Sequence, residues 1–156
     1  VGLRGDDKVA VYSPNHAMAY ACLLGIQRAG LVWAPVNARN AIEENLYILD
    51  NTDVAFLFYH SSFEGYLPRI REACPKIRDF VCIDLPSFDD WLAAQAPQAP
   101  DLPDDPDAVA FLAFLVGLSG DHSPTPWTPT PRGSHALFAA DWALSDAPTT
   151  SRRTAP

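Results

Sequence analysis

His60, Ser61 and Ser62 stand together at the end of an apolar stretch, and Asp53 lies a few residues upstream. A hydroxyl, an imidazole and a carboxylate are the groups of a nucleophilic relay, in which histidine takes the serine proton and the carboxylate orients the histidine. The same residue types are common in polar loops, where they bond to the backbone. The sequence favours the loop interpretation, so no catalytic residue is assigned here.

Other side chains that could take part in catalysis or metal binding are also better explained by structural roles. His16 lies near an expected helix start, where an imidazole usually caps the helix or is solvated. The carboxylates of residues 101–107 (DLPDDPD) lack the Gly turn and closing Glu of a calcium loop, which favours a solvated linker. Cys22, Cys74 and Cys82 each lie in an apolar stretch at scattered spacing, which indicates buried thiols rather than disulfides or zinc ligands. We therefore assign no metal-binding or cofactor-binding residue.

Composition narrows the class of protein. The 156 residues are 48% hydrophobic, which suits one globular unit or a piece of a larger one, and the formal net charge is −8. That charge argues against nucleic acid or an anionic membrane surface as a partner, because both need clustered Lys and Arg. The longest apolar run, 109–116, is too short for a membrane span, and the first residues lack a signal-peptide pattern. A cytoplasmic location is expected.

The composition changes near residue 115. We expect a partial α/β domain over residues 1–115 and a Pro/Thr/Ser-rich, largely disordered tail over residues 116–156. Six threonines and six prolines follow residue 115, whereas Ile, Lys, Asn, Tyr and Met do not occur there. Such a segment has too few aliphatic residues for a core of its own. Within it, residues 123–131 suit an extended polyproline helix, and residues 135–146 suit a short amphipathic helix that docks on the domain.

The elements that must position these side chains follow from hydrophobic patterning. Apolar runs predict strands at 8–12, 31–36, 54–59, 79–84 and 109–115, each separated from the next by a stretch with helical spacing. Strands that are apolar on both faces, alternating with helices, indicate a mostly parallel sheet with helices on both faces.

Helix boundaries are predicted from capping signals. Ser13 with Pro14 is expected to begin the first helix, which is apolar on nearly every side and so reads as buried, and Gly30 to end it. Asn40 and Glu43 have the spacing of a capping box for the second helix. Pro68 is expected near the start of the third, and Ser87, followed by Asp89 and Asp90, at the start of the fourth.

Several short motifs appear together in the first sixty residues. They are the "GD-x-VAV" strand, "PN" opening a helix, "RAG" closing it, "P-x-N-x-R" after the next strand and "ILDNTD" ending an acidic helix. Their order resembles the N-terminal region of adenylate-forming enzymes, specifically the acyl-CoA synthetases or fatty-acid-CoA ligases. The residues that carry most of the match are Pro14, Asn15, Arg28, Ala29, Gly30, Pro35, Asn37 and Arg39. The resemblance covers about residues 1–114.

This resemblance implies a function. Such enzymes join a carboxylic acid to the α-phosphate of ATP, giving an acyl-adenylate, and then transfer the acyl group to coenzyme A, with magnesium as a further cofactor. The family's functional positions have no matching position here, so no catalytic, cofactor-binding or metal-binding residue is carried over. No cofactor is expected for this chain alone. The expected function is a truncated relative of acyl-CoA ligases that is inactive by itself.

The resemblance ends where the family's nucleotide loop should begin. That loop, rich in Ser, Thr and Gly and closed by Pro-Lys-Gly, wraps the phosphates of ATP, and it follows the strand that corresponds to 109–115. Here Gly117, Ser119 and Gly120 are present, but Asp121 places a carboxylate there and no lysine follows Lys76. Codons can be chosen for residues 115–118 whose shifted frame reads Gly-Gly-Thr, the expected start of the loop. The tail is therefore interpreted as a divergent segment whose origin is a frameshift, a natural truncation or an artefact.

A second hypothesis belongs to a different class. The chain would be a non-enzymatic interaction fragment, a partial α/β unit that binds a partner through its tail or associates with itself. An apolar sheet edge or face left open favours pairing, so a homo-oligomer is expected through that surface.

Overall fold

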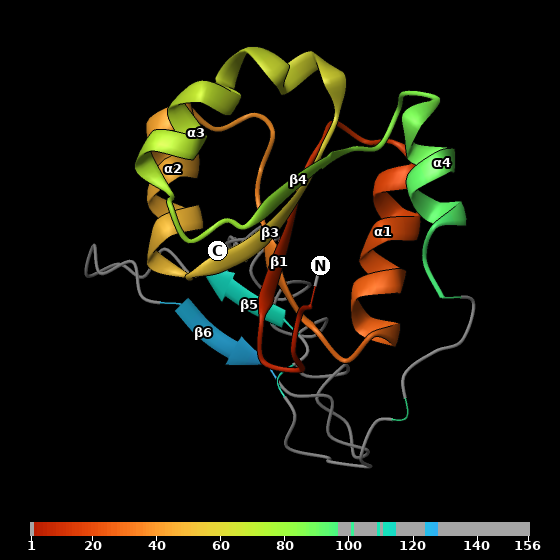
Figure 1. Cartoon of the computed structure of the whole chain (residues 1–156). Helices are drawn as coiled ribbons and strands as arrows, with labels where there is room; N and C mark the ends of the chain where they lie inside the picture. The colour runs from red at the N-terminus through yellow and green to blue at the C-terminus, as the bar shows by residue number, and fades with distance from the viewer. Residues whose placement is uncertain (1, 97–100, 102–108, 110, 115–123, 128–156) are drawn as a thin grey trace, which may run out of the picture.

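The protein is a single mostly parallel sheet between two layers of helices (Figure 1). The computed structural model describes residues 2–96, 101, 109, 111–114 and 124–127. The strands are β1 (Lys8–Tyr12), β2 (Val32–Pro35), β3 (Val54–Tyr59), β4 (Asp79–Cys82), β5 (Phe111–Phe114) and β6 (Pro124–Trp127). The helices are α1 (Ala17–Arg28), α2 (Ile42–Asn51), α3 (Leu67–Ala73), α4 (Ser87–Ala93) and the 3-10 helix η1 (Ser61–Tyr66).

The sheet order is β4-β3-β1-β2-β5-β6, and every pair is parallel except β5 with β6. The predicted α/β class and mostly parallel sheet are confirmed. Strands β1 and β3 have the predicted bounds, whereas β4 ends at Cys82 rather than at residue 84. The chain moves from β1 to β2 on one side and from β3 to β4 on the other, so right-handed crossovers place their helices on opposite faces.

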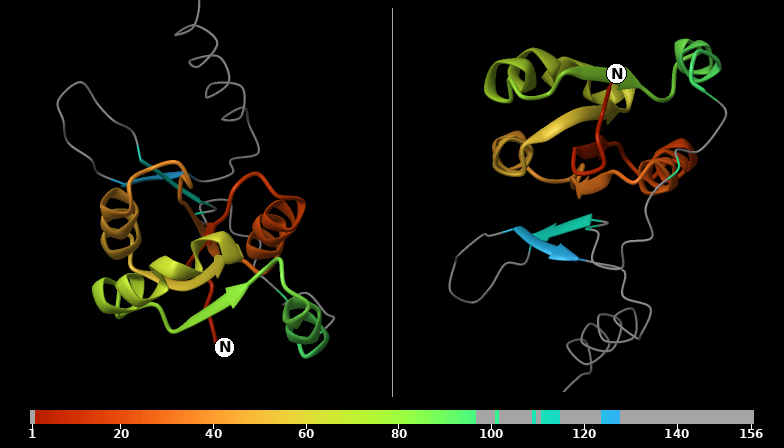
Figure 2. Two further views of the ribbon diagram at one scale, coloured as in Figure 1. Left: turned by 90° about the horizontal axis from the view of Figure 1, so that it is seen from above. Right: turned by 60° about the horizontal axis from the view of Figure 1, so that its bottom comes forward.

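Two cores, one on each face of the sheet, follow from that path. Helices α2 and α3 cover one face and α1 and α4 the other, as Figure 2 shows from above. Residues of β1 alternate between the cores: Ala10 and Tyr12 face α2 and α3, while Val9 and Val11 face α1 and α4. Strand β3 is buried along nearly its whole length. Burial on both faces explains why these strands are continuously apolar.

The prediction that α1 is buried on every side is wrong. Only Cys22 and Ile26 of this helix are buried, whereas Tyr20 is 64% and Leu24 48% exposed. The helix lies on the sheet with one face, and no described residue covers its outer face. An apolar composition does not say which neighbours are present. Self-association through an exposed edge or face stays a prediction.

Three predicted helix starts are also wrong. The first helix begins at Ala17 with His16 as its cap, and the Ser13 hydroxyl donates to the Pro14 carbonyl instead. Helix α2 begins after Ala41 without a side-chain cap, so the capping box of Asn40 and Glu43 does not form.

Helix α4 begins after Pro86, and Ser87 makes no cap bond, although Asp89 and Asp90 do lie in its first turn. Gly30, with a φ of 68°, ends α1 as predicted, because this left-handed conformation suits glycine. Pro68 lies in the first turn of α3, also as predicted.

The described part of the predicted tail includes one strand. Residues Pro124–Trp127 form β6, paired antiparallel with β5, where the sequence predicted disorder or a polyproline helix. Proline is tolerated here because β6 lies at the edge of the sheet. The rest of that polyproline segment and the amphipathic segment 135–146 lie outside the described residues. No helix in the described ranges has the length and apolar run that a membrane span requires.

Candidate functional site

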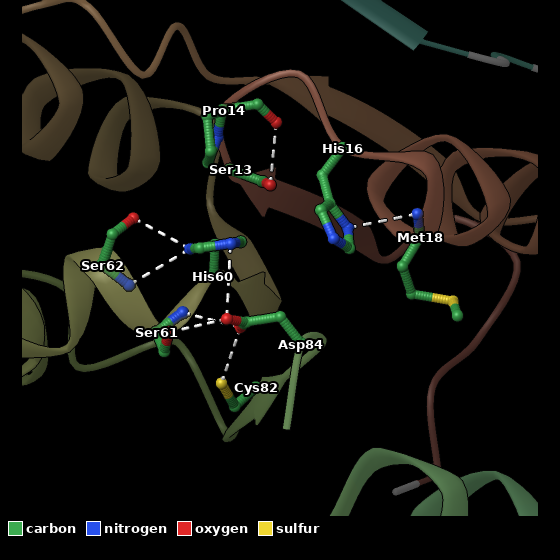
Figure 3. A network of polar contacts seen from close by, with 9 residues as sticks. All are labelled: Ser13, Pro14, His16, Met18, His60, Ser61, Ser62, Cys82 and Asp84. Atoms are coloured by element: carbon green, nitrogen blue, oxygen red, sulfur yellow. Dashed lines mark hydrogen bonds and ion pairs between the residues drawn. The ribbon is translucent and has the colours of Figure 1, made fainter. Parts of the chain in front are cut away.

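The polar side chains that could take part in catalysis converge at the carboxyl ends of β1, β3 and β4 (Figure 3). His60 follows β3, and Ser61 and Ser62 begin η1. Asp84 follows β4, and its carboxylate lies near His60 because the carboxyl ends of the parallel strands β3 and β4 are at the same end of the sheet. His60 Nε2 lies 3.3 Å from Asp84 Oδ2, and His60 Nδ1 lies 2.9 Å from Ser62 Oγ.

Asp53 does not join this cluster. It lies at the opposite end of β3, where its carboxylate pairs with Lys76. The acid that reaches His60 is Asp84, which the sequence analysis missed. Its position as the last residue of the strand predicted over 79–84 was the available signal, since the carboxyl ends of parallel strands meet at one end of the sheet.

Asp84 is surrounded by hydrogen-bond donors. The Ser61 N–H donates to Oδ1 at 2.7 Å, the Ser61 hydroxyl to Oδ2 at 2.6 Å and the Cys82 thiol to Oδ1 at 3.2 Å. Burial alone would raise the pKa of Asp84, but these donors and nearby His60 outweigh it and lower the pKa to about 2. The carboxylate is therefore ionised at neutral pH and ties the start of η1 to the end of β4.

The arrangement around His60 is that of a helix cap rather than an activated nucleophile. His60 Nδ1 accepts the Ser62 N–H at 3.1 Å, so its lone pair serves the first turn of η1 as well as the Ser62 hydroxyl. His16 acts in the same way, because its Nδ1 accepts the Met18 N–H at 3.2 Å. His16 thus caps α1, one of the two roles expected for it, and His60 caps the 3-10 helix η1.

A separate cavity lies elsewhere among the described residues. It has a volume of about 550 Å³ and lies between α1 and α4 against one face of the sheet. Apolar side chains such as Met18, Phe56 and Trp91 line most of it. The titratable groups on its wall are the buried Cys22 and, from the end of α1, Arg28. This pocket is partly open with mostly apolar walls, and no carboxylate or histidine is among its lining residues.

The cysteines behave as buried thiols. Cys22 and Cys74 are buried, Cys82 is half-buried, and all three are free. Burial raises the pKa of Cys22 to about 11 and, with the charge of Asp50 in addition, raises that of Cys74 to the same range. We expect Cys22 and Cys74 to react with iodoacetamide at pH 8 about 100-fold more slowly in the native chain than in urea, because little thiolate is present.

Mass spectrometry of each cysteine peptide over time measures this difference. The half-buried Cys82 is expected to react before the other two in the native chain. Equal labelling rates for Cys22 in native and denatured protein would contradict the described core.

The family-like motif residues have structural tasks in the described region. The side-chain oxygen of Asn37 accepts the backbone N–H of Arg39 at 3.0 Å. The backbone carbonyl of Asn37 accepts the side-chain amide N–H of Asn45, also at 3.0 Å. Asn45 is fully buried in α2, so this contact fixes the loop after β2. Asn45 was not among the residues singled out from the sequence.

The two segments that were considered as a cation site or a phosphate loop, and not assigned as such, lie mostly outside the described residues. The residues outside the described ranges are Gly117, Ser119, Gly120, Asp121 and residues 102–107 of the acidic linker. Asp101 is described and exposed. In the described ranges no group of three His, Cys, Asp or Glu side chains is arranged to hold a metal ion.

Comparison with known proteins identifies similar sequences. A medium/long-chain-fatty-acid–CoA/3-oxocholest-4-en-26-oate–CoA ligase from Mycolicibacterium smegmatis is 28% identical over 90 residues, which cover 58% of this chain and 16% of that protein. A crotonobetaine/carnitine–CoA ligase from Salmonella paratyphi A is 29% identical over 92 residues, covering 57% and 18%. The chain thus spans less than a fifth of the length of these curated relatives.

Solved structures share the fold. The N-terminal domain of FACL13 from Mycobacterium tuberculosis matches with a TM-score of 0.73 and 23% identity, covering 92% of this chain and 35% of that chain. The anthranilate CoA ligase AuaEII matches with a TM-score of 0.74 and 22% identity, covering 92% and 27%. The family model of the AMP-binding enzymes matches residues 1–120. This match includes most of the sequence, and the chain belongs to the AMP-binding enzyme family.

Proposed function

We propose that this chain provides the first part of the sheet in an enzyme that activates a carboxylic acid with ATP and passes the acyl group to coenzyme A. The observation that carries the proposal is the family match over residues 1–120. The relatives named above are acid–CoA ligases, which supports a fatty or related carboxylic acid as the substrate class. The 156 residues by themselves do not catalyse this reaction.

The described residues do not fit ATP or magnesium. The oxygen atoms of Asp84 are already occupied by the donors of Ser61, Cys82 and His60, and no three-ligand cluster exists in the described ranges. A phosphate site needs backbone N–H groups from a glycine-rich turn and a cation near them. No step of the reaction is therefore assigned to these side chains.

The sequence after β5 supports inactivity. Asp121 would bring negative charge against a phosphate, and the two lysines of the chain, Lys8 and Lys76, lie far earlier. Lys76 pairs with Asp53 at the amino end of β3, away from the carboxyl edge. Neither lysine is placed where the nucleotide loop of the family would be.

Exchange of radioactive pyrophosphate into ATP tests the proposal. We expect the purified chain to show no carboxylate-dependent exchange above the buffer background, with a panel of medium-chain, long-chain and aryl acids. The complete M. smegmatis relative serves as the positive control under the same conditions. Losing one transition-state donor typically costs on the order of 100- to 1000-fold in rate, and here a whole loop differs.

A second preparation separates trace contamination from activity of the chain. A mock purification from cells that do not express the chain, carried out identically, contains the same contaminants. Exchange that scales with the concentration of the 156-residue chain and persists after repeated purification would overturn the claim of inactivity. The residues to examine next would then be Gly117, Ser119 and Gly120.

A further inference from the structure

The cavity between α1 and α4 has two unlike walls. One wall carries four aromatic side chains, which are Phe56 and Phe58 from β3 and Phe88 and Trp91 from α4. The Phe88 and Trp91 rings are stacked, with centroids 5.7 Å apart and planes 11° apart, and Phe58 meets Trp91 edge to face at 5.6 Å. The three phenylalanines are buried, whereas Trp91 is half-buried, so Trp91 is the one of these four rings with substantial accessible surface.

The opposite wall is formed by α1, where small residues leave the space open. Ala21, Gly25 and the C-cap residue Ala29 follow one another at four-residue spacing, which places them on one side of the helix, and all three line the cavity. A Cβ at Gly25 would point into open space, with no packed neighbour within 4 Å. Because these side chains are short, they do not fill the space between α1 and α4, which has a volume of about 550 Å³.

Arg28 is the one charged side chain among the described residues that line this cavity. It lies exposed in the last turn of α1, and its guanidinium forms no hydrogen bond or ion pair with another described residue. A cation in this position is stabilised by the carbonyl groups at the end of the helix. That interaction uses no specific acceptor, so the N–H groups of the guanidinium remain available to an anion. The cavity therefore combines apolar walls with a single positive charge.

We propose that this cavity binds a planar aromatic molecule of one or two rings that carries a single anionic group. Pockets for small molecules have volumes of about 300–1,000 Å³, mostly apolar walls and few polar groups, and this cavity has each of these properties. The ring of the ligand lies against Trp91 in the space left by Gly25, and its anionic group pairs with Arg28.

An aromatic ring is favoured over an alkyl chain by the composition of the wall. Pairs of aromatic rings attract each other in stacked and edge-to-face geometries beyond what the burial of apolar area contributes, and the Phe88–Trp91 stack already presents such a surface. Binding in this cavity uses neither ATP nor coenzyme A. It therefore does not depend on the proposed ligase function, and either can fail without the other.

Equilibrium dialysis of the full chain with naphthalene-2-sulfonate measures binding, and the indole N–H signal of Trp91 in nuclear magnetic resonance spectra locates it. We expect one probe per chain and a shift of the Trp91 signal that follows occupancy. Naphthalene-2-sulfonamide has the same rings without the charge and should bind about fivefold more weakly, the size of one exposed ion pair. Decane-1-sulfonate has the charge without the rings and should also bind more weakly. If it binds as tightly, or if Trp91 does not respond, the proposal is wrong.

Two variants separate the space from the charge. Gly25→Leu fills the cavity and should reduce the affinity about tenfold, because the probe loses apolar area to bury, while leucine also favours the helix. Gly65→Leu is its control, since Gly65 also has open space around it but lies in η1 and does not line the cavity. Arg28→Gln should weaken binding of the sulfonate about fivefold and leave the sulfonamide unchanged, whereas the exposed Arg39, changed to Gln, should affect neither.

Two other occupants of the cavity are distinguishable in the same spectra. If Trp142→Ala shifts the Trp91 signal without probe, residues 135–146 of this chain occupy the cavity. If dilution of the chain alone shifts that signal, a second copy occupies it. Either result, or equal affinity of the native chain and Gly25→Leu for the probe, would overturn the proposal.

Discussion

Phe56→Ala is expected to lower the free energy of unfolding by about 4 kcal/mol. Phe56 is 1% exposed in β3, between β4 and β1, and its ring centroid lies 4.9 Å from that of Phe58 and 6.2 Å from that of Trp91. Its ring also borders the apolar cavity between α1 and α4. Removing it enlarges a hollow that the surrounding aromatic rings already fail to fill, so little of the loss is recovered by relaxation.

Urea denaturation followed by tryptophan fluorescence measures this loss. Leu24→Ala is the matched control, because it also removes an apolar side chain but from the outer face of α1, where Leu24 is 48% exposed. The control should change stability by less than about 0.5 kcal/mol. A loss below about 1.5 kcal/mol for Phe56→Ala would contradict the packing described for this face.

Asp84→Ala is expected to lower stability by about 3 kcal/mol at pH 7. The variant removes the acceptor of the Ser61 N–H, the Ser61 hydroxyl and the Cys82 thiol, and it leaves these donors in a partly buried place. Hydrogen bonds to charged acceptors are stronger than neutral ones, and an unpaired donor adds its own desolvation cost. The connection between the ends of β3 and β4 should be the first to loosen.

The same variant should change the response to acid. The pKa of Asp84 is about 2 in the folded chain, below the value near 3.9 of an unfolded aspartate, so its contribution is present above pH 4. It is lost as the pH falls from about 4 to 2. With allowance for solvent screening, this amounts to about 1–2 kcal/mol in the native chain and nothing in Asp84→Ala.

Denaturation curves at several pH values between 2 and 7 test this difference. Asp6→Ala removes an exposed carboxylate at the other end of the sheet and should retain the acid-dependent loss. If Asp84→Ala and the native chain lose the same stability between pH 4 and 2, the carboxylate does not have the role described.

The apolar strands β1 to β5 were predictable because continuous hydrophobicity marks them, whereas the proline-containing β6 was not. A strand such as β3 is buried on both faces, so its residues are apolar without interruption and the pattern is unambiguous. The helix starts were not predictable in the same way. Several polar residues precede each helix, and only the three-dimensional path of the chain determines which of them caps it. Ser13 has the better intrinsic preference as a cap, yet the chain turns so that His16 reaches the first free N–H.

The candidate site was half predictable for a related reason. His60, Ser61 and Ser62 are neighbours in the sequence, so their grouping was visible. Asp84 comes from another strand, and its partnership with His60 depends on the register of β3 with β4, in which Tyr59 lies opposite Cys82. Such a contact depends on which strands are neighbours in the sheet, and it cannot be predicted from residue spacing along the chain.

The prolines of β6 determine where the sheet stops growing. Proline has no N–H, so the donors that β6 offers to β5 must come from Thr125 and Trp127, which lie opposite Ala113 and Phe111. Pro124 and Pro126 then direct their nitrogen atoms away from β5. At Pro124 and Pro126 the outer edge of β6 therefore presents carbonyl groups but no N–H groups. A further strand would find no hydrogen-bond donor for its own carbonyl groups at these two positions. Among the strands that the structure describes, addition of a strand from another chain would have to use β4, at the opposite border of the sheet.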